Sequence, residues 1–214
     1  MPRGFYARSS TVVARALLGR TLVRETARGV LAGVIVEVEA YGGERDPASH
    51  AYRGETRRNR VMFGPAGHAY VYLSYGMHYC LNVVTGTPGR GSAVLIRALE
   101  PVAGERTMAR RRGVGETHQL MRGPGCVGQA LGLTLREDGA DLTRGSIWIA
   151  DRTPRRRTIG VSPRIGITRA ADWPWRFFLA GNPCVSGPRA GRVSAGGPPA
   201  RPGRGARPPK TLRR

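Results

Sequence analysis

Lysine is almost absent from this sequence. Of its 35 basic residues only Lys210 is a lysine, and all the others are arginines. Acidic residues are also few, 14 in all, so the formal net charge is +21 at pH 7. A charge of this sign and size favours a polyanionic partner, and arginine suits paired hydrogen bonds to phosphate. Membrane-surface binding would need an amphipathic basic helix with bulky apolar residues, and the sequence contains none.

Long apolar runs and cysteine pairs are missing as well. No stretch reaches the roughly 18 apolar residues of a membrane span, and the N-terminus lacks the apolar core of a signal peptide. The three cysteines lie far apart, and no CxxC or HxxxH spacing occurs. These absences argue against a disulfide framework and a metal site. We expect a cytoplasmic protein, associated with the nucleoid if bacterial, that binds no metal and no membrane.

The C-terminal stretch differs in composition from the rest of the chain. Residues 189–214 contain eight basic residues, no acidic residue and almost no apolar bulk. Such a segment cannot bury a core, and we expect it to be disordered. The length then predicts one folded domain over residues 1–188. Whether the tail adds affinity for phosphates or is a neutral extension stays open.

Apolar periodicity and turn residues predict many short strands and few helices. Strands are expected at residues 30–41, 69–73, 78–85, 94–99 (ended by Pro101), 147–150 and 164–167. Helices are expected at residues 11–18 and 104–112, with a further one starting near residue 127. The pattern predicts an α+β fold, a single domain on a curved antiparallel β-sheet (a partly open barrel) with flanking helices and a protruding β-hairpin.

Potential chemistry is concentrated between residues 35 and 82, which contain six of the seven tyrosines. Within strand 30–41, alternation places Glu37, Glu39 and Tyr41 on the face opposite a set of valines that should be core. Two carboxylates at this spacing lie about 7 Å apart. They are either a pair of the kind used in glycoside hydrolysis or part of a solvated strand face. Gly42 and Gly43, just after Tyr41, favour a strand that ends near a ligand.

Two loop features follow this strand. His50, in the loop ERDPASH, is a candidate to hydrogen-bond a heterocycle or a phosphate. The next segment, RGETRRNR, is rich in arginine and includes Arg57, Arg58 and Arg60. It is either a solvated loop or a contact with a phosphate backbone.

The predicted hairpin carries large side chains at its turn. Tyr70 and Tyr72 share one strand face, whereas Tyr75 and Met77 fall at the tip. Proteins that kink DNA insert such side chains between base pairs. The alternative is a tip that folds back onto its own domain.

Two polar residues lie in apolar strands. Asn82 has Leu81 and Val83 as neighbours and needs hydrogen-bond partners, either as a structural bond or as a specificity contact. Arg97, in residues 94–99, is costly to bury without a partner. It either pairs with a carboxylate such as Glu39, which would keep that carboxylate ionised, or points outward from an edge strand.

These residues lie in motifs that resemble the alkyladenine (3-methyladenine) DNA glycosylase family. The resemblance covers about residues 14–186. The motifs that carry it occur in family order: LLGRTLVR, VEVEAYGGERDPASHAYRG, NRVMFGPAGHAYVYLSYGMHYCLNVV, VLIRALEP, RGPGCVGQALGL, SPRIGI and RFFLAGNPCVS. The short loop after His50, the basic tail and His78 depart from the family pattern and leave the range of lesions open.

The resemblance implies hydrolysis of the N-glycosidic bond of damaged purines in double-stranded DNA, by a monomer without a cofactor. Glu39 would be the general base that activates water, and Arg97 and the backbone carbonyl of Ile167 would hold that water. The pocket around the extruded base would be formed by three side chains: Tyr41, His50 and Tyr72.

The resemblance also implies roles for the remaining candidate residues. Asn82 would clash with the exocyclic amine of normal guanine, and Tyr75, with Met77 beside it, would fill the gap in the duplex. No role for Glu37 follows. Water is the expected nucleophile because no lysine precedes Lys210, although Pro2 would offer an amine if Met1 were removed. The rivals are a noncatalytic nucleic-acid-binding protein and a glycosylase acting on nucleotides or RNA.

Overall fold

The structure, a computed structural model, describes residues 1–150, 157–187 and 192–194. Its strands are β1 (Thr21–Thr26), β2 (Gly29–Tyr41), β3 (Ala69–Ser74), β4 (His78–Thr85), β5 (Ser92–Ala103), β6 (Ile147–Ala150), β7 (Ile159–Ser162), β8 (Arg176–Leu179) and β9 (Arg192–Ser194). Its helices are α1 (Arg3–Tyr6), α2 (Ser10–Leu17), α3 (Glu105–Arg112) and α4 (Pro124–Leu131). Four short 3-10 turns complete it: η1 (Gly43–Arg45), η2 (Arg60–Phe63), η3 (Thr117–Gln119) and η4 (Leu135–Glu137).

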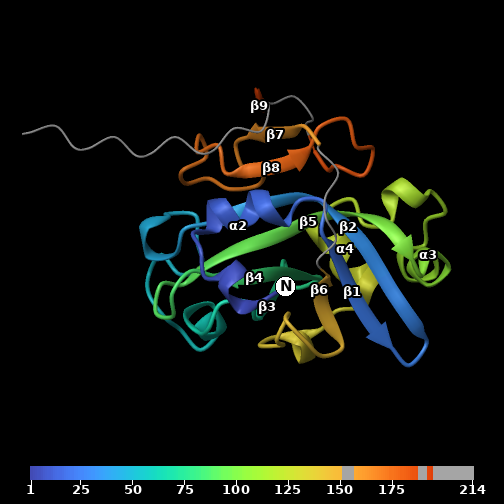
Figure 1. The fold of residues 1–214 in the computed structure, drawn as a ribbon, viewed down its shortest axis with the longest axis horizontal. Coiled ribbons are helices and arrows are strands. Elements are labelled where there is room, and N and C mark those ends of the chain that lie inside the picture. Colours follow the sequence, from blue (N-terminus) through green and yellow to red (C-terminus); the bar gives the residue numbers. More distant parts are fainter. Residues whose placement is uncertain (151–156, 188–191, 195–214) are drawn as a thin grey trace, which may run out of the picture.

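The strands form one antiparallel sheet that curls into a half-barrel (Figure 1). The order along it is β3-β4-β5-β2-β8-β7-β9, and β1 pairs with both β2 and β6. The predicted α+β fold on a curved antiparallel sheet is confirmed. None of the helices in the described part of the chain combines the length and the hydropathy needed to cross a bilayer.

Strand β2 lies at the centre of this sheet and carries the candidate carboxylates. It pairs with β5 along one edge and with β1 and then β8 along the other. The predicted core face is confirmed, because Val36, Val38 and Ala40 are fully buried. Helix α2 packs across β2 and β5 (Figure 1).

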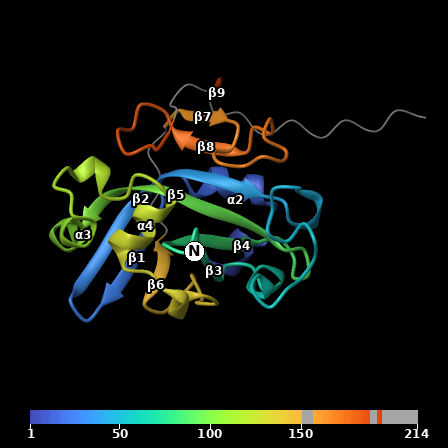
Figure 2. The same cartoon turned by 180° about the vertical axis from the view of Figure 1, so that it is seen from behind.

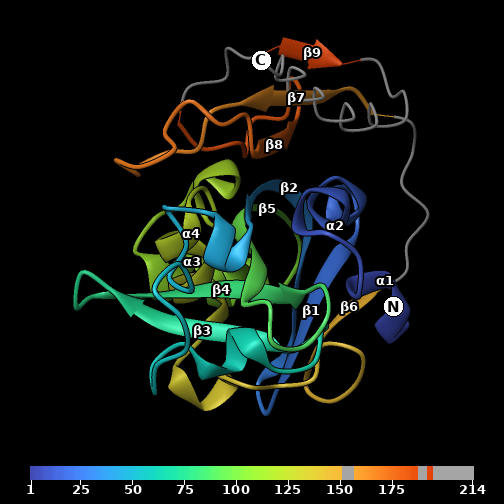
Figure 3. The same cartoon turned by 90° about the vertical axis from the view of Figure 1, so that its left-hand side faces the viewer.

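The β3–β4 hairpin projects from the side of the molecule that lies opposite α2 (Figure 3). Helix α4 packs against β4 on the same side, in front of the sheet when the molecule is seen from behind (Figure 2). Gly128 allows this approach, since a Cβ there would collide with the carbonyl oxygen of Tyr79. The helix predicted to start near residue 127 is present as α4, but it begins earlier, at Pro124.

Strand β5 does not end at Pro101, contrary to the sequence-based prediction. Pro101 stands opposite Gly33, and the strand continues to Ala103. The register with β2 shifts between Ala32 and Gly33. Proline is tolerated at such an irregularity because the ladder needs no hydrogen bond from its nitrogen there.

The strand predicted at residues 164–167 is also wrong. Strand β7 ends at Ser162, and the following residues form an irregular loop in which Gly166 has a φ of +76°. The amide of Ile165 donates to the carboxylate of Glu39 rather than to a neighbouring strand. In this segment a hydrogen bond to a side chain thus takes the place of backbone pairing with another strand.

The predicted tail falls mostly outside the described residues. Within residues 189–214 the structure describes only β9, which pairs antiparallel with β7.

Candidate active site

A cavity of about 440 Å³ opens between the β3–β4 hairpin, the end of β2 and the loop after β7. Most of the residues proposed from the sequence line it: Tyr41, His50, Arg58, Tyr72, Tyr75, Asn82, Arg97 and Ile167. Tyr70, Cys80, Ile165 and Pro124 of α4 also contribute to its wall. Residues separated by more than a hundred positions in the sequence therefore meet around one space.

One wall of this cavity is aromatic. The rings of Tyr70 and Tyr72 are stacked at 5.5 Å, and His50 meets Tyr72 edge to face at 4.5 Å. His50 Nδ1 and the Tyr70 hydroxyl are 3.0 Å apart. Burial, with nearby Arg58, lowers the pKa of His50, and burial raises the pKa of Tyr70 to about 12. At neutral pH the wall therefore presents a neutral imidazole and protonated phenols.

Glu39 lies directly behind the cavity wall and is fully buried, as is Glu37, so the solvated strand face is excluded. Its carboxylate accepts hydrogen bonds from the Tyr41 hydroxyl at 2.9 Å and from the Ile165 amide at 2.7 Å. Arg97 Nη1 lies 3.1 Å from the same carboxylate. All three partners line the cavity, whereas Glu39 itself does not.

Burial and charge set the protonation of these partners. Burial raises the pKa of Tyr41, and the neighbouring Glu39 carboxylate raises it further, so the hydroxyl is a donor at neutral pH. Burial alone would lower the pKa of Arg97, but Glu39 and Glu37 outweigh it and the pKa rises. The predicted pairing of Arg97 with Glu39 is thus present in the structure.

Glu37, for which the sequence offered no role, holds Arg97 from the other side. Its carboxylate accepts from Arg97 Nε at 2.9 Å and from Arg176 Nε at 2.7 Å. It also accepts from the Ser186 amide at 2.6 Å and the Ser186 hydroxyl at 3.0 Å. The β2–β5 register shifts on both sides of Glu37, next to Arg97. Glu37 therefore fixes the guanidinium that contacts Glu39.

The tip of the hairpin does not fold back onto the domain. Tyr75 is 87% exposed and Met77 is 71% exposed. Tyr75 adopts a left-handed backbone conformation with a φ of +49°, and the turn is closed by a 3.1 Å hydrogen bond from the Met77 amide to the Ser74 carbonyl. A left-handed residue with a Cβ costs about 1–2 kcal/mol. The backbone is therefore strained at the residue that holds the Tyr75 ring outward at the rim of the cavity.

The arginine-rich loop borders the same rim. Arg58 donates to the Leu73 carbonyl at 3.0 Å, and its guanidinium lies 5.6 Å from the centre of the Tyr72 ring. Arg57 and Arg60 are exposed but do not line the cavity.

Comparison with known proteins shows the family of this chain. A family model described as methylpurine-DNA glycosylase (MPG) matches residues 4–183. The chain belongs to this family. Membership makes it a DNA glycosylase, a hydrolase of N-glycosyl bonds whose substrate is DNA, and confirms the resemblance found in the motifs.

Curated proteins agree with this family assignment. Two are 52% identical to the chain, from Carboxydothermus hydrogenoformans over 188 residues and from Methanoculleus marisnigri over 192 residues. Each alignment covers 87% of this chain and 98% of the relative. A protein from Rhodopseudomonas palustris (strain CGA009) is 50% identical over 188 residues, with 88% of each chain covered. All three are named "Putative 3-methyladenine DNA glycosylase".

Sequence reasoning missed several contributors to the candidate site, among them Tyr70 and the amide of Ile165. Tyr70 is part of the aromatic wall, and its position on the same strand face as Tyr72 was a signal for that role. The Ile165 amide donates to Glu39, and only the SPRIGI motif pointed to this segment. A backbone donor has no signature in residue type.

Glu37 gives a stability prediction for this glycosylase. We expect Glu37→Gln to lower the free energy of unfolding by about 3–5 kcal/mol, because two buried guanidinium groups would lose their shared carboxylate. Urea denaturation of the purified variant measures this change. Glu116→Gln, at a mostly exposed position, serves as the control and should leave stability unchanged. A Glu37→Gln variant as stable as the wild type would contradict the network described above.

Proposed function

We propose that this glycosylase acts as a monomer on double-stranded DNA, removes alkylated purines of the 3-methyladenine type, and hydrolyses the N-glycosidic bond with water activated by Glu39. One observation carries the proposal. A buried carboxylate, kept next to the Arg97 guanidinium, lies immediately behind an aromatic-walled cavity. No other described carboxylate is in contact with three residues of that wall.

The cavity suits a base that has left the helix. The C1′ atom of a stacked nucleotide is inaccessible, so the nucleotide must rotate out of the duplex. Alkylated purines carry positive charge, and tyrosine faces favour a cation by about 0.5–2 kcal/mol. Tyr41 and Tyr72 supply such faces, and His50 supplies a neutral hydrogen-bonding edge. The exposed ring of Tyr75 fills the space that the base vacates in the stack.

The chemical step depends on the carboxylate of Glu39 and the guanidinium of Arg97. The Tyr41 hydroxyl donates to Oε2 of Glu39, and the attacking water binds to a second lone pair of the carboxylate when DNA binds. Glu39 accepts the proton of the water as its oxygen attacks C1′, and the electrons of the broken glycosidic bond neutralise the cationic purine. Arg97 and the Ile167 carbonyl orient the water. The carboxylate also stabilises the positive charge that develops on the sugar.

Base release from defined oligonucleotides tests this proposal. Duplexes carrying 3-methyladenine, 7-methylguanine, hypoxanthine or ethenoadenine are compared at one salt concentration, because phosphate binding at this charge depends strongly on salt. We expect faster release of the cationic 3-methyladenine than of the uncharged hypoxanthine and ethenoadenine, since a cationic base leaves without acid assistance. No release from any of the four duplexes would overturn the proposal.

Asn82 gives a prediction about specificity. The residue is 5% exposed and lines the cavity, and its side-chain amide donates to the Tyr70 carbonyl at 3.2 Å, so the position of the amide is set by the neighbouring strand β3. We expect Asn82→Ala to increase the release of normal guanine from undamaged duplex DNA, because the amide no longer opposes the exocyclic amine. Long incubations with excess enzyme measure this release. Guanine release that stays at the level of a Glu39→Gln background would contradict the role.

A further inference from the structure

Arg164 and Asp46 form a second buried ion pair at the edge of the candidate site. Both side chains are completely buried. Two guanidinium nitrogens contact two carboxylate oxygens, Nη1 with Oδ2 and Nη2 with Oδ1 at 2.9 Å. Nη1 also donates to the carbonyl of Ala40 at 3.0 Å, one residue after Glu39. The pair therefore joins the loop after β7 to the end of β2.

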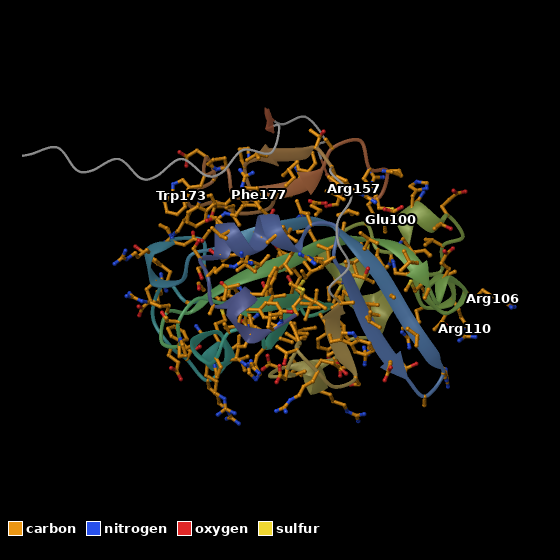
Figure 4. All side chains as sticks on the ribbon, in the orientation of Figure 1. Glu100, Arg106, Arg110, Arg157, Trp173 and Phe177 are labelled. Carbon is orange, nitrogen blue, oxygen red and sulfur yellow. The ribbon has the colours of Figure 1, made fainter. Side chains whose placement is uncertain are left out.

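The guanidinium is enclosed by aromatic rings. Its carbon lies 4.7 Å from the centre of the Tyr41 ring, 5.3 Å from that of Trp175 and 5.9 Å from that of Trp173. Trp173 is found at the end of the β7–β8 layer in Figure 4. Arg164 thus packs against the ring of Tyr41, a residue that lines the cavity.

Two routes lead from this pair to Glu39. The residue after Arg164 is Ile165, whose amide donates to Glu39 Oε1, and the ring stacked on Arg164 is Tyr41, whose hydroxyl donates to Oε2. Asp46 in turn accepts from the amides of Gly42 at 3.0 Å and Ala48 at 3.1 Å, and Ala48 lines the cavity.

Stability alone does not account for this arrangement. Taking two charges out of water costs free energy that their attraction only partly offsets, and apolar side chains of equal volume are often as stable. Arg164 Nε is, in addition, buried without a hydrogen-bond partner among the described residues. The fork of arginine does, however, fix direction as well as distance, which lysine cannot do.

We propose that the Arg164–Asp46 pair positions both donors of Glu39, the Ile165 amide and the Tyr41 hydroxyl, and thereby sets the rate of the hydrolytic step. Neither residue touches the substrate, so both are positioning residues. The inference rests on the proposed function, because it concerns the same carboxylate.

The test separates the rate of chemistry from DNA binding and from folding. The variants are Arg164→Lys, which keeps the charge without the fork, and Asp46→Asn, which keeps the shape. The control is Arg24→Lys in a pair with Glu137 at 2.7 Å, whose members do not line the cavity. Single-turnover release of 3-methyladenine at saturating enzyme is compared with the Kd for a duplex that carries a tetrahydrofuran abasic analogue, and with the thermal midpoint.

We expect each variant of the pair to release base about 100-fold more slowly, the order of effect of a misplacement of about 1 Å. The Kd for the abasic duplex should not change, and the double variant should be no slower than either single variant, because both remove one interaction. Arg24→Lys should keep the wild-type rate. If Arg164→Lys does not fold, Asp46→Asn carries the same test.

Other results overturn the inference. Wild-type rates in folded variants that are merely less stable would make the pair structural, and a parallel loss of rate and of binding to the abasic duplex would make it part of the binding wall. Wild-type enzyme that releases no base would instead overturn the proposed function, and the inference with it. Release by the wild type and equally by Arg164→Lys would overturn the inference alone.

Discussion

Glu39→Gln is expected to slow the release of 3-methyladenine by about 10²–10⁴-fold, the contribution of a general base. Glutamine preserves the shape of the side chain, but its amide cannot accept the proton of the attacking water. The change also removes the negative charge that pairs with Arg97, whose Nη1 lies 3.1 Å from the carboxylate in the wild type. Single-turnover release from a duplex with one lesion measures the effect without product release.

A DNA-binding measurement and a matched control variant are needed to interpret this result. Glu39→Gln should still bind a duplex with a tetrahydrofuran site, because the arginine loop and the hairpin tip are untouched. Glu137→Gln, at a carboxylate outside the cavity, should release base at the wild-type rate. Activity that is the same in Glu39→Gln and the wild type would exclude Glu39 as the general base.

Tyr75→Ser is expected to slow base release from duplex DNA by about 100-fold while leaving release from a damaged single strand or nucleoside almost unchanged. Unstacking and unpairing a nucleotide costs a few kcal/mol, and a wedge that occupies the gap offsets much of it. Tyr75 is suited to this task because the residue is 87% exposed at the tip of a projecting hairpin. Parallel assays on matched duplex and single-stranded substrates measure the difference.

The left-handed backbone conformation of Tyr75 makes a second variant necessary. Serine is strained at a φ of +49°, whereas asparagine tolerates the left-handed region and so removes the ring without adding strain. Tyr75→Asn should therefore reproduce the duplex-specific loss, and Val30→Ser, at an exposed apolar residue remote from the tip, should not. Equal loss on both substrates, or loss on neither, would exclude the role of Tyr75 as a wedge in the duplex.

Local patterns predicted the elements that carry the site. Alternation identified β2 and its buried valine face, and the turn Ser74–Met77 identified the β3–β4 hairpin, because both signals depend on neighbours in the chain. The helix expected at residues 11–18 occurs as α2, and that at residues 104–112 as α3. Where contacts from elsewhere decide the backbone, prediction failed: β5 passes Pro101 at an irregular register, and the loop after β7 bonds to Glu39 instead of to a strand.

The sequence by itself determined the basic charge, the strand that bears Glu37 and Glu39, and the hairpin with large side chains at its tip. It also determined the family, because the motifs occur in order along nearly the whole chain. Only the tertiary structure decided that both glutamates are buried, that Glu37 holds Arg97, and that Arg164 meets Asp46 at a separation of 118 positions. Periodicity shows which face a side chain is on, but not which distant residue lies opposite it, and that pairing depends on how the sheet curls.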